Sequence, residues 1–188
     1  MKAKTDKQLM LEYASGNPKA FEELFRRYGK KLYNLFLRSL NKTQLAQDLL
    51  QECFLRVIES KDRYRPTKDF SNWIFTIAMN LIRDKYREQT RRKMGPISES
   101  LELHGVEPEL DNQQPDRNLE KLQLKEAVVA AMGTLAKDQQ EVIILSKYQG
   151  FSFLEIAEIL NISPAAAKQK AYRAMQHLTK KLAYLNED

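Results

Sequence analysis

The chain is poor in the residues that make covalent or metal-bound cores. It has one cysteine, Cys53, and two histidines, His104 and His177, among 188 residues. A single cysteine excludes an internal disulfide and a cysteine-based metal cluster, and the two histidines are far apart in sequence. Cys53 has apolar neighbours, which favours a small core residue. We therefore expect neither a metal site nor a cofactor.

Glycine, proline and long apolar runs are also scarce. There are six glycines and six prolines, while 43% of the residues are hydrophobic, which is enough for a core. Together with long helical periodicities, this composition predicts an all-α fold. No window approaches the ~20 apolar residues that a membrane span needs. The first ten residues, MKAKTDKQLM, lack the apolar stretch of a secretory signal. We expect a cytoplasmic protein without membrane insertion.

Common enzymatic signatures are missing as well. The chain contains no GxxxxGK(S/T), GxGxxG, HExxH or GxSxG motif. Its serine, histidine and acidic residues show no spacing that is typical of a catalytic nucleophile or base. We therefore expect that the chain is not an enzyme. Its net charge of +6 and pI near 9.3 favour polyanionic partners instead.

Charge and turn residues divide the chain into two parts. Helical periodicity ends near Lys93 and resumes near Leu119, and the segment between them is rich in glycine and proline. It predicts a flexible acidic linker at 94–118, with small helical domains at 1–93 and 119–188. Its acidic residues, opposed only by Arg117, are Glu99, Glu102, Glu107, Glu109, Asp111 and Asp116. Such a linker can serve solubility and stiffness, or it can occupy a channel meant for nucleic acid.

The first part has the pattern of four helices. Thr5 or Asp6 can cap the first, and residues 17–18, Asn-Pro, can begin the second. The third follows residues 41–43, and the fourth begins near Asp69. The residues expected on their apolar sides are Phe21, Leu24, Phe25, Leu32 and Phe36, then Leu45, Leu49, Leu50, Cys53, Phe54 and Val57, then Phe70, Trp73, Ile74, Ile77, Ala78, Leu81 and Ile82.

The outward side of the fourth predicted helix is rich in amides and cations. Between Lys61 and Lys93 there are ten basic and four acidic residues, and the loop before the helix adds an aromatic residue. A surface of this kind can track phosphates and hold unstacked bases. The alternative is a solvated basic helix end, where cations also suit the C-terminal helix dipole.

A helix-turn-helix is predicted between residues 150 and 182. Ser152 and Glu155 form a capping box for its first helix, and residues 163–164, Ser-Pro, can begin the second. One face of the second helix holds Ala167, Ala171, Ala174, Leu178 and Leu182. Another face holds Ala165, Lys168, Gln169, Tyr172 and Gln176. The first face can lie close to a neighbouring helix, and the second suits phosphates and base edges. An ordinary pair of amphipathic helices is the alternative.

Four blocks of the sequence resemble, in order, the bacterial extracytoplasmic-function (ECF) sigma factors of the sigma-70 family. They are AFEELFRRYGKKLYNL at 20–35, AQDLLQECFLRV at 46–57, FSNWIFTIAMNLIRDKYR at 70–87 and EIAEILNISPAAAKQKAYRA at 155–174. A helix-turn-helix alone is unspecific, whereas four ordered blocks around a linker are highly specific. The resemblance implies a transcription initiation factor that binds core RNA polymerase, brings it to −35/−10 promoters and opens the −10 DNA.

The resemblance also implies partners and contact residues. For the surface that docks on the clamp helices of core RNA polymerase, the resemblance implies contacts by Asp48, Gln51, Glu52, Leu55 and Arg56. For capture of the separated strand at the −10 element, the resemblance implies contacts by Tyr64, Lys68, Asn72, Asn80, Arg83 and Arg87. For promoter DNA at the −35 element, it implies Lys168, Gln169 and Tyr172 at bases, and Lys147, Lys170 and Arg173 at phosphates. An anti-sigma factor is a further partner that the family implies.

The second helix of the helix-turn-helix departs from the family pattern. The usual small-Thr-Val-Lys-Ser-Arg-Leu run is replaced by AAAKQKA at 165–171. Ala166 lacks the hydroxyl of threonine, and Lys170 lacks the bidentate geometry of arginine. The −35 sequence that this helix would bind therefore stays open. Two rival interpretations are a stand-alone helix-turn-helix regulator that acts without polymerase, and a protein-interaction module that keeps the scaffold.

Overall fold

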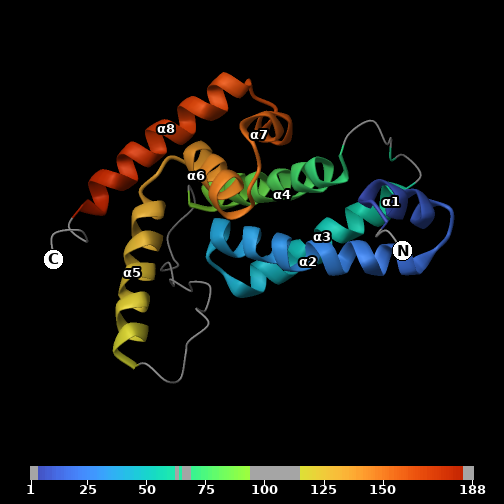
Figure 1. The fold of residues 1–188 in the computed structure, drawn as a ribbon, viewed down its shortest axis with the longest axis horizontal. Coiled ribbons are helices and arrows are strands. Elements are labelled where there is room, and N and C mark those ends of the chain that lie inside the picture. Colours follow the sequence, from blue (N-terminus) through green and yellow to red (C-terminus); the bar gives the residue numbers. More distant parts are fainter. Residues whose placement is uncertain (1–3, 62–63, 65–68, 94–114, 184–188) are drawn as a thin grey trace. The chain divides into compact units, whose positions relative to one another are not determined.

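The protein is described by a computed structural model in which residues 4–61, 64, 69–93 and 115–183 are placed (Figure 1). Within these residues the secondary structure is helical and includes no strand, which confirms the predicted all-α fold. The elements are α1 (Asp6–Ala14), α2 (Pro18–Leu40), α3 (Thr43–Glu59), α4 (Phe70–Lys93), α5 (Pro115–Gly133), α6 (Lys137–Ile143), the π-helical turn η2 (Ile144–Tyr148), α7 (Phe153–Leu160) and α8 (Pro164–Lys181).

The helices form two compact units. The N-terminal domain contains α1 to α4, and the C-terminal domain contains α5, α6, η2, α8 and most of α7. Most of the predicted linker lies outside the described residues. Its last part is helical, however, because α5 begins at Pro115, within the predicted linker 94–118. Proline at a first helical position costs no hydrogen bond, so this proline starts a helix and does not mark a loop.

Local capping sets the starts of α1 and α2, as the sequence predicts. The Thr5 side chain accepts a hydrogen bond from the Gln8 amide, and the Gln8 side chain accepts one from the Thr5 amide. At the start of α2, the Asn17 side chain accepts from the Lys19 amide at 3.2 Å, and Pro18 occupies the first helical position. Each cap satisfies an amide that the helix itself leaves without a partner.

The N-terminal domain is built around α2, which packs against α1, α3 and α4. Its core holds large side chains that are almost fully buried, including Leu24, Leu32 and Phe36 from α2. The predicted Cys53 and Phe54 of α3 are also buried, and burial raises the pKa of the Cys53 thiol to about 12. The predicted stripe of α4 is buried at Phe70, Ile74, Ala78, Leu81 and Ile82. Leu49 and Val57 of α3 are buried as well, whereas the predicted core residues Phe21, Leu45, Leu50, Trp73 and Ile77 are half-buried.

The prediction that Phe25 is buried is wrong. Its side chain is 46% exposed, although its ring lies against that of Phe54 with a centroid distance of 4.7 Å. The core of α2 is a row at four-residue steps that includes Leu24 and Leu32. Phe25 stands about 100° around the helix from Leu24, at the edge of that row.

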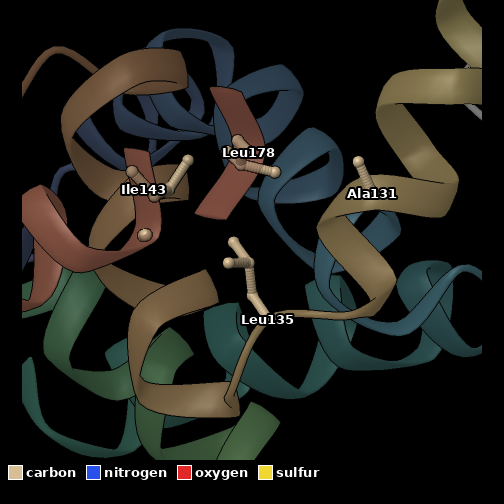
Figure 2. Packing of buried hydrophobic residues seen from close by; sticks show 5 residues of the cluster. Ala131, Leu135, Ile143 and Leu178 are labelled. Carbon is tan, nitrogen blue, oxygen red and sulfur yellow. The ribbon is translucent and has the colours of Figure 1, made fainter. Parts of the chain in front are cut away.

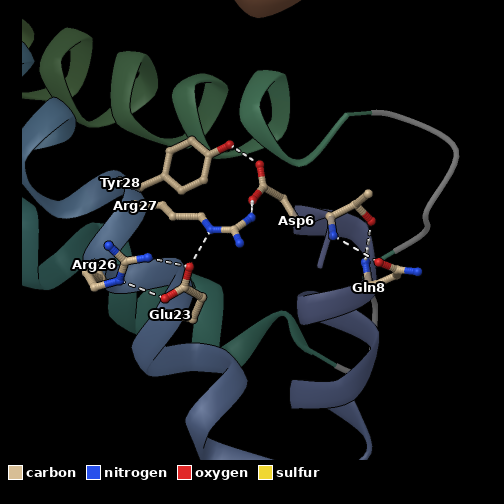
Figure 3. Close-up of polar contacts among 7 residues, drawn as sticks. Asp6, Gln8, Glu23, Arg26, Arg27 and Tyr28 are labelled. Carbon is tan, nitrogen blue, oxygen red and sulfur yellow. Dashed lines mark hydrogen bonds and ion pairs between the residues drawn. The ribbon is translucent and has the colours of Figure 1, made fainter. Parts of the chain in front are cut away.

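An ion-pair network joins α1 to α2 (Figure 3). The Asp6 carboxylate accepts hydrogen bonds from Arg27 Nη1 at 2.6 Å and from Tyr28 Oη at 2.5 Å. Arg27 and Arg26 both donate to Glu23, each at 2.7 Å. These two arginines lower the pKa of the Glu23 carboxyl from 4.5 to about 2. The contacts of Asp6 with Arg27 and Tyr28 therefore hold α1 against α2.

The C-terminal domain packs α8 against α6 and α5. Figure 2 shows the apolar cluster between these helices, formed by Ala131, Leu135, Ile143, Ala174 and Leu178. The turn from α5 to α6 is closed by a buried amide. The Gln140 side chain donates to the backbone oxygens of Met132 at 2.7 Å and Leu135 at 3.2 Å. Small side chains in the cluster let α8 lie close to its neighbours.

Candidate nucleic-acid and protein interfaces

The outward face of α3 combines charge with exposed apolar area. Leu49, Cys53 and Phe54 point into the core, which leaves the opposite face to solvent. That face contains the predicted residues Asp48, Gln51, Glu52, Leu55 and Arg56. Leu55 is 56% exposed, and Arg56 donates to Glu52 at 2.7 Å. A leucine held out of the core between charged neighbours is available to a partner.

Sequence reasoning missed Ile58 on the same face. Ile58 is 37% exposed. Because it follows Leu55 by three residues, the two side chains are neighbours along α3. The signal was present in the sequence, because positions 55 and 58 both fall off the stripe of Leu49, Cys53 and Val57. We name the five predicted residues of α3, together with Ile58, the α3 face.

The predicted −10 residues lie in several environments. Asn80 is exposed in the middle of α4, and Arg87 is exposed near its end, where it pairs with Asp84 at 3.1 Å. Arg83 is half-buried between them, whereas Asn72 is buried in the first turn. Asn80, Arg83 and Arg87 follow one another at spacings of three and four, which places them on one side of α4. The predicted Lys68 lies outside the described residues.

Tyr64 is buried, in contrast to the open position that direct base contact would require. Its ring lies 6.2 Å from that of Phe70 and 5.2 Å from that of Trp73, measured between centroids. Burial raises the pKa of its hydroxyl, and among the described residues that hydroxyl has no hydrogen-bond partner. Phe70 also contacts the ring of Tyr28, at 5.3 Å. The aromatic contacts thus hold Tyr64 against the first turn of α4.

The predicted helix-turn-helix is present as α7 and α8. The Ser152 hydroxyl accepts from the Glu155 amide at 3.3 Å, and the Glu155 carboxylate accepts from the Ser152 amide at 2.8 Å. Asn161 has a left-handed backbone with φ of 54°, which ends α7. The Ser163 hydroxyl then accepts from the Ala166 amide at 3.1 Å and begins α8. Local chemistry alone therefore produces the turn.

The two faces of α8 match the prediction. Ala167, Ala171 and Ala174 are buried, whereas the predicted base-facing residues Lys168, Gln169 and Tyr172 are exposed. The Gln176 side chain donates to Tyr172 Oη at 2.9 Å, which restricts the ring on the outward face. Of the predicted phosphate contacts, Lys147 is exposed in η2 and Arg173 is exposed on α8. Lys170 is half-buried and pairs with Asp138 of α6.

The described residues contain no group of three or more histidine, cysteine, aspartate or glutamate side chains placed to hold a metal ion. None of the helices in the same part of the chain is long and apolar enough to cross a membrane.

Comparison with known protein families identifies both domains. The family described as Sigma-70 region 2 matches residues 24–92, and the family described as Sigma-70, region 4 matches residues 125–178. The chain is 34% identical to RNA polymerase sigma factor CarQ of Myxococcus xanthus, over 94% of this chain and 97% of that protein. It is 28% identical to ECF RNA polymerase sigma factor SigW of Bacillus subtilis, over 94% of this chain and 96% of that protein. The chain belongs to the ECF sigma factors of the sigma-70 family.

Solved structures of other sigma factors agree with this assignment. The structure of CnrH in complex with the cytosolic domain of CnrY has a TM-score of 0.69 at 27% identity and covers 97% of this sigma factor and 98% of CnrH. The Bartonella quintana sigma factor RpoE, solved with the anti-sigma factor NepR, shares the fold at a TM-score of 0.70 and 23% identity, over 88% of this chain and 98% of RpoE.

The two family matches agree with the two compact units of the fold. The region 2 match runs from within α2 to near the end of α4. The region 4 match runs from the second half of α5, through α6, η2 and α7, to near the end of α8. This sigma factor is a transcription initiation factor that acts with core RNA polymerase at promoters. Sigma factors are not enzymes.

Proposed function

We propose that the α3 face is the surface by which this sigma factor docks on the clamp helices of core RNA polymerase. The observation that carries the proposal is the exposure of Leu55 and Ile58 on an otherwise charged face. An apolar centre surrounded by charged residues is the usual anatomy of a specific protein interface. The Arg56–Glu52 pair holds the side chains beside Leu55 in an ordered arrangement.

The loop before α4 and the outward side of α4 capture the separated −10 strand. Asn80, Arg83 and Arg87 provide amide and guanidinium groups in a row, and cations along such a row bind successive phosphates. Lys68, Asn72 and Tyr64 complete the proposed set. Because Tyr64 is packed against Phe70 and Trp73, its role in this proposal is to support the loop that binds the strand.

The outward face of α8 binds the −35 element as duplex. Lys168, Gln169 and Tyr172 face base edges, while Lys147 and Arg173 bind phosphates. The carrying observation is the division of α8 into a buried alanine face and an exposed polar face. Because α8 packs against its neighbours through small residues, its opposite face stays open to a groove.

An anti-sigma factor is a further proposed partner. CnrH, which is similar to this chain over almost its full length, was solved with the cytosolic domain of CnrY. A similar partner would hold this sigma factor inactive until a signal releases it. We expect the protein to act in the cytoplasm, where core polymerase and the chromosome are found.

Reconstitution with core RNA polymerase tests the proposal directly. Transcripts from genomic fragments are mapped with core alone and with core plus the full chain. Specific start sites that need the chain are expected. Specific binding to a duplex operator without core, and no new start sites with it, would instead favour the stand-alone regulator.

A substitution at Leu55 tests the α3 face. Leu55→Glu places a charge at the proposed interface and should weaken binding to core at least about tenfold, equivalent to about 1.4 kcal/mol. Leu11→Glu is the matched control, since Leu11 is also an exposed leucine but lies on α1. Binding is measured by fluorescence anisotropy with labelled sigma factor. Equal binding by the two variants would remove the α3 face from the interface.

A substitution at Arg87 tests the −10 assignment. Arg87→Ala and Arg83→Ala should each lower the formation of open complexes and reduce the slope of log K against log salt by about 0.7. Arg26→Ala is the control, because Arg26 is an exposed arginine of α2 that also pairs with a carboxylate. Permanganate footprinting measures opening of the −10 DNA. If Arg87→Ala behaves like Arg26→Ala, α4 is not the strand-binding element.

A further inference from the structure

One lysine of α8 forms an ion pair with an acidic residue of α6 in the same domain. Lys170 Nζ of α8 donates to Asp138 Oδ2 of α6, across 32 residues of sequence. Both side chains keep contact with solvent, at 31% exposure for Lys170 and 51% for Asp138. The neighbouring cations Lys168 and Arg173 are exposed, and no ion pair to either is found among the described residues.

The pair changes the charge that α8 presents to DNA. Aspartate is ionised at neutral pH even at its ordinary pKa, and the hydrogen bond from Lys170 lowers the pKa of Asp138 further. Asp138 stands in the first turn of α6, where the helix dipole also favours a negative charge. A surface ion pair of this exposure contributes little to the stability of a fold. Its larger effect is to neutralise one cation of a helix whose partner is a polyanion.

We propose that Asp138 limits the affinity of this sigma factor for duplex DNA by holding Lys170 away from phosphate binding. The inference rests on the proposed binding of duplex by α8, and it assigns Lys170 a role different from that of Lys147 and Arg173. The consequence is functional. A chain whose own duplex affinity is kept low does not occupy DNA by charge alone, so stable binding requires the additional contacts of the polymerase complex.

The test is binding of the full chain to a short fluorescein-labelled duplex of mixed sequence, titrated between about 50 and about 200 mM salt. Asp138→Asn frees Lys170 and adds one phosphate contact, which should steepen the slope of log K against log salt by about 0.9. The gain in affinity is then about threefold larger at the lower salt concentration than at the higher. Glu126→Gln is the matched control, because Glu126 is an exposed carboxylate of α5 in the same domain.

A double variant assigns the gain to Lys170. Asp138→Asn with Lys170→Gln should lose the added slope, whereas Glu126→Gln alone should leave the slope near that of the natural chain. An equal slope in Asp138→Asn and Glu126→Gln would overturn the inference. A gain that persists in the double variant would overturn it as well, because the effect would then not pass through Lys170.

The variant Lys168→Gln, with Asp138 unchanged, distinguishes a failure of the proposed duplex binding by α8 from a failure of the inference about Asp138. If α8 binds duplex, this variant lowers affinity whatever the result for Asp138. If Lys168→Gln leaves binding unchanged, α8 is not the duplex-binding element. If Lys168→Gln weakens binding and Asp138→Asn does not strengthen it beyond Glu126→Gln, only the role of Asp138 is refuted. Thermal unfolding of each variant confirms that the fold is kept.

Discussion

The two domains of this sigma factor are packed with side chains of very different size. The N-terminal domain buries Phe36, Phe70 and Phe75 almost completely, and its aromatic rings contact one another from α1 to α4. The C-terminal domain places Ala167, Ala171 and Ala174 at the inner face of α8. Large side chains bury more apolar area for each residue, so each buried ring of the N-terminal domain removes more apolar surface from water than each alanine of α8.

The difference follows from what each domain presents to its partner. The N-terminal domain offers exposed apolar side chains, Leu55 and Ile58, for another protein, and a large core holds α3 in position around them. The C-terminal domain offers a polar helix to a groove. Alanine packing brings α8 close to α6 and leaves the outward face of α8 open. Three predictions test this comparison, from the largest effect to the smallest.

The largest effect is expected from a cavity in the N-terminal core. Phe36 is fully buried in α2, so Phe36→Ala should destabilise the N-terminal domain by about 3–5 kcal/mol. Differential scanning calorimetry should show its transition moving to lower temperature while that of the C-terminal domain stays in place. Phe25→Ala, on the same helix but 46% exposed, is the control with a smaller loss. Equal losses would mean that the core does not depend on large side chains.

A smaller effect is expected from overfilling the alanine face of α8. Ala174 has no exposed area and lies in the cluster of Figure 2. Ala174→Leu should destabilise the C-terminal domain by about 1–3 kcal/mol, because the added carbons push α8 away from its neighbours. Ala165→Leu puts the same side chain at an exposed position of α8 and should cost little. Calorimetry of both variants measures the difference, and a stabilising Ala174→Leu would disprove close packing here.

The smallest effect is expected in the response to acid, and only in the N-terminal domain. Folding lowers the pKa of Glu23, so its contribution to stability is present above pH 4.5 and is lost as the pH falls towards about 2. Glu23→Gln should therefore flatten the fall of the N-terminal melting temperature across this range. Glu22→Gln, an exposed neighbour, leaves the cluster of Figure 3 intact and should keep the natural acid response. Identical pH profiles for the two variants would contradict the assignment.

Local chemistry made much of the fold predictable. Caps at Thr5, Asn17 and Ser163 depend on residues at most three positions apart, and each prediction is confirmed. The stripe of α4 and the alanine face of α8 follow from helical periodicity, which a sequence displays directly. Pro115 is the exception, since proline is typical of both loops and helix starts.

The candidate site was less predictable than the fold. The sequence identified the outward residues of α3 and α8, because a residue off the apolar stripe of a helix is exposed wherever the helix packs. It did not identify Ile58, nor the burial of Tyr64 among Phe70 and Trp73. The contacts of individual residues with polymerase and promoter remain predictions.

The sequence by itself determined the helices of the N-terminal domain and the helix-turn-helix, most of their buried faces, the two-part organisation and the family. Only the tertiary structure decided that Phe25 stays at the surface and that Lys170 is paired with Asp138. The physical reason is range. Capping and periodicity act over a few residues, whereas the pairing of side chains on α6 and α8 depends on how two helices cross. That crossing is set by small side chains such as Ala174, whose meaning appears only when the helices are packed.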